Sequence, residues 1–187
     1  MKIPRLPFNA IVATAMVSNS TFAAVFHWDG SDSTANADGG AGVWDTLATN
    51  WDTAAVSGSS VGWPAVSTSD DDAVFGGTAG SVSITPAGVV ANSVTFGTAG
   101  YSLTGGSLTL DGGTPSITND VAASIGANLI GTSGLNKIGN GTLTISGNNT
   151  GISGLLTISG ATSGNNGGVN ASGANSIAGF TGINIQN

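Results

Sequence analysis

The side chains that could perform acid–base chemistry in this sequence are few, and nearly all are aspartates. Ten acidic residues, all aspartate, stand against three basic residues and one histidine. One run of carboxylates stands out, at Asp70, Asp71 and Asp72, where alternation along an extended strand sends Asp70 and Asp72 to one face. Such a pair could bind a metal ion or act on a glycosidic bond. We favour the simpler interpretation, a solvated strand edge that discourages aggregation.

No other motif adds catalytic or cofactor chemistry. His27 has no second histidine or cysteine to act as a co-ligand, since the chain has no cysteine. The glycine-rich run at 76–80 is not followed by the Lys-Ser/Thr pair of a phosphate-binding loop. We therefore expect no cofactor and no enzymatic activity. A polysaccharide-active β-helix enzyme that uses an aspartate pair remains the least favoured alternative.

Aromatic side chains offer a second kind of chemistry, the stacking of rings on sugars. All four tryptophans, Trp28, Trp44, Trp51 and Trp63, lie within residues 26–64, and three of them stand beside Asp or Asn. Asp and Asn side chains favour turns, so these rings are expected beside strand ends. The rings could form a glycan-binding module. We favour a packing role instead, as an N-terminal cap that covers the first coil of a stacked structure.

Composition limits the partners. The formal net charge is −7, which opposes binding to nucleic acid or to an anionic membrane. Extracellular glycans or surface proteins are the partners that we expect. Charged residues make up only 7% of the chain, so the charge pairs that decorate surface helices cannot form, and an all-β fold is predicted.

The first residues have the order of a secretory signal peptide. Lys2 and Arg5 precede a mostly apolar stretch from Ile11 to Val17, followed by small residues up to Ala23. We expect a signal peptide at 1–23 and cleavage after Ala23. An ordinary N-terminal strand is the alternative. No later run is long and apolar enough to span a membrane, so none is expected in the mature chain.

After a tryptophan-rich segment at 24–68, residues 69–187 become repetitive. Short alternating strands recur at a spacing close to twenty residues, and glycine and asparagine supply the turns. Alternation sends one set of side chains to a core and the Ser and Thr residues between them to solvent. The core set is Val82, Ile84, Val94, Phe96, Leu108, Leu110, Leu143, Ile145, Leu156, Ile158, Ile183 and Ile185. An antiparallel sandwich would show the same alternation, but the near-constant spacing favours a parallel β-solenoid.

The run from Gly134 to Thr150, GLNKIGNGTLTISGNNT, resembles the repeat of autotransporter-associated β-strand repeat proteins. The tryptophan-rich start resembles the entry segment of such proteins more loosely. The resemblance implies a right-handed parallel β-helix, and it places Lys137 at the lysine position of the repeat. We expect this lysine on the surface of a coil.

The resemblance also implies a location and a role: an adhesin-like or structural passenger that is secreted or held at the cell surface of the outer membrane. Such passengers carry a membrane-embedded secretion domain, which the repeats do not resemble. The 69–187 array is therefore expected either to be truncated at its C-terminal end or to be secreted by another protein. An uncapped last coil would favour end-to-end self-association.

Overall fold

The structure is a computed structural model that describes residues 23–32, 34–65, 70–160 and 167–186. The expected signal peptide lies outside this range, apart from Ala23. The described residues form β-strands and turns, with no helix among them. Consequently none of them belongs to a long apolar helix of the kind that crosses a bilayer.

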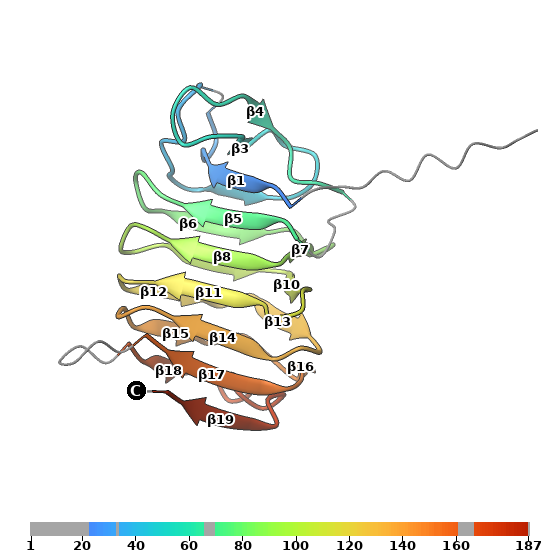
Figure 1. Cartoon of the computed structure of the whole chain (residues 1–187). Helices are drawn as coiled ribbons and strands as arrows, with labels where there is room; N and C mark the ends of the chain where they lie inside the picture. Colours follow the sequence, from blue (N-terminus) through green and yellow to red (C-terminus); the bar gives the residue numbers. More distant parts are fainter. Residues whose placement is uncertain (1–22, 33, 66–69, 161–166, 187) are drawn as a thin grey trace, which may run out of the picture.

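Three sheets run along the molecule (Figure 1). The largest has nine strands, in the order β19 (Gly182–Ile185), β17 (Leu155–Ser159), β14 (Leu135–Ile138), β11 (Ser116–Asn119), β8 (Ser93–Phe96), β5 (Asp72–Phe75), β1 (Val25–Trp28), β3 (Trp51–Asp52) and β4 (Ser60–Val61). The second has six, in the order β18 (Val169–Ala171), β15 (Leu143–Ile145), β12 (Ala123–Ile125), β9 (Ser102–Gly105), β6 (Ser81–Ile84) and β2 (Gly42–Trp44). The third has four, in the order β16 (Gly151–Ile152), β13 (Asn128–Gly131), β10 (Ser107–Leu110) and β7 (Val89–Ala91).

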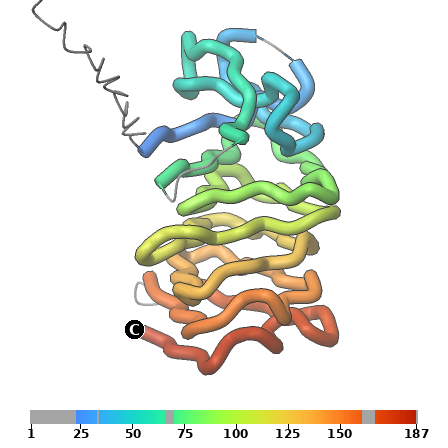
Figure 2. Tube along the Cα trace, turned by 90° about the vertical axis from the view of Figure 1, so that its right-hand side faces the viewer, coloured from blue at the N-terminus to red at the C-terminus, as the bar shows by residue number. Residues whose placement is uncertain are grey.

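Successive strands of the chain go to different sheets, which is the arrangement of a parallel β-solenoid. Four complete coils each contribute one strand to every sheet, beginning with β5, β6 and β7 and ending with β14, β15 and β16. All pairings between these coils are parallel. Figure 2 shows the stacked coils from a second side. The solenoid predicted from the repeat spacing is confirmed, and the antiparallel sandwich is wrong.

The register gives the length of the repeat. Asp72, Ser93, Ser116, Asn136 and Thr157 are successive partners across the nine-stranded sheet, so four consecutive coil steps are 20 to 23 residues long. The next step, from Thr157 to Asn184, takes 27 residues. The alternation in sequence matches this geometry: in β6 Val82 and Ile84 are buried while Ser81 and Ser83 are exposed.

The core is a continuous column of inward side chains. Its N-terminal end is aromatic, because the rings of Phe75 and Phe96 stack with centroids 5.4 Å apart and pack below the tryptophans. Further along the chain it becomes aliphatic. Most of the predicted core residues are buried, and Ile158 is partly buried.

The last two predicted core residues are an exception. Ile183 and Ile185 are register partners of Leu156 and Ile158, yet they are 53% and 68% exposed. They lie in β19, the terminal strand of its sheet, and no described segment pairs with its free edge. The prediction that they are buried is wrong, because burial in a solenoid requires a neighbouring coil on both sides.

The tryptophan-rich segment is joined to the solenoid as its first layer. β1 and β2 pair in parallel with β5 and β6, so the segment supplies partners to two of the three sheets. β3 and β4 then add to β1 in antiparallel fashion, which ends the parallel stack. In Figure 1 this segment lies above the coils, at the opposite end from β19.

Candidate functional surface

The four tryptophans form one cluster. Trp28, Trp44 and Trp51 are fully buried and Trp63 is 1% exposed. Neighbouring rings have centroids 4.8 to 5.0 Å apart, several in the edge-to-face arrangement that aromatic pairs prefer. The cluster rests on Phe75, the first aromatic residue of the coil below. No ring presents a face to solvent, so none can stack on a sugar while this segment is folded in this way.

Turns beside the tryptophans are made by Asp and Asn side chains, as the sequence indicates. Asp45 Oδ1 accepts hydrogen bonds from the backbone N–H groups of Leu47, at 2.9 Å, and Ala48, at 2.7 Å. Asn50 Nδ2 donates to the carbonyl of Val43 at 2.8 Å. These bonds fix the loop between β2 and β3 and so position the rings.

A group of aspartates lies near the tryptophan cluster. Asp29 and Asp52 are fully buried; Asp29 Oδ2 and both carboxylate oxygens of Asp52 have no hydrogen-bond partner among the described residues. Burial raises the pKa of Asp29 to about 6, and the nearby charges of Asp32 and Asp52 and a side-chain hydrogen bond with Asp32 act in the same direction. The N–H of Asp38 bonds to Asp29 Oδ1 at 3.1 Å and opposes the shift. No sequence motif marks this group, because its members are dispersed along the chain.

The two aspartates that were candidates for a metal site are placed differently. Asp70 is exposed. Asp72 Oδ1 accepts hydrogen bonds from Asn92 Nδ2, at 2.9 Å, and Ser93 Oγ, at 2.7 Å, so it binds the next coil of the solenoid. Within the described part of the chain, no three histidine or aspartate side chains are grouped so that they could hold a metal ion.

Lys137 is buried, so its predicted surface position is wrong. In the inner face of the nine-stranded sheet it lies between its register partners Ile117 and Ile158, and its exposed fraction is 0%. The ammonium group donates to the carbonyl oxygen of Gly139. Burial lowers the pKa of Lys137, and the negative charge of Asp120 partly offsets this.

Asparagines connect coils at the turns. Asn149 is fully buried; its Oδ1 accepts from the N–H of Leu129 at 2.6 Å, and its Nδ2 donates to the carbonyl of Ser176 at 2.7 Å. It therefore joins three levels of the stack, twenty residues back and 27 residues ahead. The adjacent residue makes a second bond between the same two coils, where the N–H of Asn148 donates to Asn128 Oδ1 at 2.9 Å.

The outer face of the nine-stranded sheet is the largest regular surface that the coils present. One row of outward residues crosses it in register: Asp72, Ser93, Ser116, Asn136, Thr157 and Asn184. Apart from Asp72 these are hydroxyl or amide side chains. The surface can therefore donate and accept hydrogen bonds without a formal charge over most of its length.

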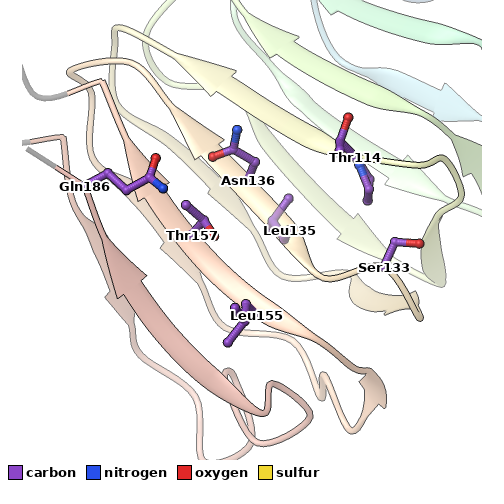
Figure 3. Close-up of a pocket in the computed structure, with 8 residues that line it drawn as sticks. Thr114, Ser133, Leu135, Asn136, Leu155, Thr157 and Gln186 are labelled. Atoms are coloured by element: carbon purple, nitrogen blue, oxygen red, sulfur yellow. The ribbon is translucent and has the colours of Figure 1, made fainter.

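A groove with a volume of about 380 Å³ lies in this face, across the levels of β11, β14, β17 and β19 (Figure 3). Its lining residues lie in β14 and β17, just before β11 and β14, and just after β19. Figure 3 shows Asn136 and Thr157 side by side near its centre, with Gln186 beyond one end and Ser133 at the other. The groove is lined by Thr114, Pro115, Ser133, Leu135, Asn136, Leu155, Thr157 and Gln186. Sequence reasoning did not find it, because its walls come from four levels of the stack.

Comparison with known proteins identifies a relative whose sequence is similar to this chain. Residues of this chain are 39% identical, over 122 positions, to "Adhesin BmaC autotransporter" of Brucella suis biovar 1 (strain 1330). This chain is similar to an autotransporter adhesin. The likeness covers 64% of this chain and 4% of the adhesin, so the chain spans only a small part of its relative's length. It confirms the resemblance that the repeat motif indicates.

No family model matches the chain, and no solved structure matches it. The fold therefore rests on the arrangement of strands described above, and the likeness to the adhesin rests on sequence.

Proposed function

We propose that this chain is part of an exported passenger, a non-catalytic β-solenoid displayed at the bacterial surface or released from it, which serves as an adhesin or as structural material. The observation that carries the proposal is the identity of 39% with the autotransporter adhesin across a chain that folds as stacked coils. A solenoid suits this function, because stacked repeats build extended binding surfaces from one repeated unit.

The non-catalytic part of the proposal is supported by where the carboxylates lie. Asp29 and Asp52 are enclosed, and Asp72 is hydrogen-bonded to the next coil of the solenoid. A glycosidase needs two carboxyl groups that reach the same bond from an open site. Extracellular glycans or surface proteins remain the partners that we propose, and they would meet the neutral outer face rather than the enclosed tryptophans.

The location can be tested on intact producing cells. Brief protease treatment of the cells, followed by mass spectrometry, should release peptides from residues 70–160, and the mature N-terminus should lie at Ala24. A cytoplasmic marker protein must stay intact in the same samples. Protection of the chain inside the cell, with Met1 still present, would contradict the proposal.

A further inference from the structure

We propose that the groove over β11, β14, β17 and β19 binds a neutral oligosaccharide. The inference rests on the proposed role at the cell surface, and it names the class of ligand and its place. The tryptophans, which were the alternative site for sugars, are enclosed, whereas the groove is open on the outer face of the sheet. Its volume of about 380 Å³ falls in the range of roughly 300 to 1,000 Å³ typical of small-molecule sites.

The backbone at one edge of the groove is tightly packed. Gly134, between the lining residues Ser133 and Leu135, is buried against the backbone of Leu155 in the following coil. Its φ of +78° and its close approach to the Leu155 carbonyl oxygen favour glycine at this position. This edge of the groove is therefore held by packed backbone.

The lining favours an uncharged ligand. Five of its side chains carry hydroxyl or amide groups and three are apolar, and no ionisable side chain is among them. Amides and hydroxyls both donate and accept, which suits the adjacent hydroxyl groups of a sugar. An anionic saccharide would find no base in the groove and a chain with a net charge of −7.

One polar group is already held in place. Ser159 Oγ donates to Asn136 Oδ1 at 2.8 Å, which fixes the orientation of the Asn136 amide. Leu155, 52% exposed at the edge of the groove, adds an apolar surface against which the C–H face of a sugar ring can pack. Preorganised polar groups beside an apolar contact are the usual composition of a small-molecule site.

A peptide is a less suitable occupant. Extended peptides are commonly captured at a free sheet edge, where backbone N–H and C=O groups are available. Three of the four strands that carry the groove, β11, β14 and β17, are paired on both sides. Their backbone groups are engaged, so the floor of the groove offers side chains only.

The test uses the full chain and two variants in the same turn. Ser133→Trp places a large ring in the groove, whereas Thr132→Trp changes a neighbouring exposed residue that does not line it. Amide chemical shifts are followed by NMR during titration with lactose or N,N′-diacetylchitobiose. Sialyllactose and an uncharged Ser/Thr-rich peptide are the comparison ligands. Urea denaturation checks that both variants keep the stability of the parent chain.

We expect a neutral sugar to shift resonances of residues around the groove. Ser133→Trp should weaken this binding at least tenfold, and Thr132→Trp should leave it unchanged. The inference is overturned if neither sugar shifts these resonances, if both variants bind equally well, or if sialyllactose or the peptide binds more tightly than both neutral sugars. If the chain is nevertheless found at the cell surface, such a result would refute sugar binding in the groove and would leave the proposed function unaffected.

Discussion

At the scale of single residues, the least expected features are ionisable groups in the interior. Asp29 and Lys137 are both fully buried, and no ion pair joins them to another described residue. Burial favours the neutral form of each group, and for Lys137 the negative charge of Asp120 only partly offsets this. The contribution of Asp29 to the free energy of unfolding should therefore depend on pH, and replacing Lys137 by a neutral side chain of similar shape should be tolerated.

Asp29 gives a pH dependence that belongs to the tryptophan-rich segment. Its pKa of about 6 in the folded state is above the ordinary value of 3.8, so the folded state holds a proton that the unfolded state releases. The resulting stabilisation is complete below pH 3.8 and is lost as pH rises through 6. All four tryptophans lie in this segment, so their fluorescence during urea denaturation should show greater stability at pH 5 than at pH 7.5.

Two variants check this assignment. Asp29→Asn should remove most of the difference between the two pH values, while Asp111→Asn, at an exposed position, should keep it. Equal pH dependence in both variants would show that another group is responsible.

Lys137 can be replaced without loss of its packing. Lys137→Met keeps an unbranched side chain between Ile117 and Ile158 and removes the buried ammonium, so the free energy of unfolding should stay the same or rise by about 1 kcal/mol. Lys137→Ala should instead lower it by about 2 kcal/mol or more, because it leaves a cavity. Urea denaturation distinguishes the two. If Met destabilises as much as Ala, the bond to the Gly139 carbonyl is worth more than we infer.

At the scale of elements, coils are joined by strand ladders and also by side chains that cross between levels. Asn149 shows this most clearly, since its amide bonds to the backbone of coils on both sides. Loss of this amide would leave a buried N–H and a buried carbonyl unpaired. The loss should therefore destabilise the contacts of this coil with both neighbouring coils.

We expect Asn149→Ala to lower the free energy of unfolding by about 2 to 3 kcal/mol, the usual effect of leaving buried polar groups unsatisfied. Asn148→Ala is the matched control, because its side chain is exposed and the bond of that residue to Asn128 uses its backbone N–H. The control should change stability by less than about 0.5 kcal/mol. Similar losses in both variants, measured by thermal or urea denaturation, would contradict a special role for Asn149.

The alternation of Val82 and Ile84 with serines was enough to predict strands and their faces, because these follow from local periodicity. The stacked arrangement was predicted from the repeat spacing of about twenty residues. Leu135 and Lys137 lie two residues apart in β14 and both face the core. Alternation along the strand could have placed this lysine inside, but the surface position expected for it was wrong. The role of Asn149 and the walls of the groove could not be predicted. Both depend on residues from three or more levels of the stack, whose register the sequence leaves open.

At the scale of the whole molecule, the two ends of the described structure differ. The tryptophan-rich segment closes one end with antiparallel strands. At the other end Ile183 and Ile185 are exposed on β19, next to a strand edge with which no described segment pairs. Exposed apolar edges of this kind promote association between chains.

This 187-residue chain should therefore self-associate in a concentration-dependent way. Analytical ultracentrifugation should show dimers or larger species at micromolar concentration, and Ile183→Thr combined with Ile185→Thr should reduce them. Val43→Thr, at an exposed apolar position in the tryptophan-rich segment, serves as the control. A monomeric parent chain at all concentrations would contradict the prediction.

The repeat of 20 to 23 residues between register partners has a mechanical consequence. Each strand is held by hydrogen bonds only to the levels directly above and below it, so a force applied to the two ends of the chain loads those levels one after another. Each level that peels away would release about 70 Å of extended chain, at roughly 3.3 to 3.6 Å per residue. A tether built in this way yields in small steps under flow and can recoil between them, whereas a single globular core would resist and then give way all at once.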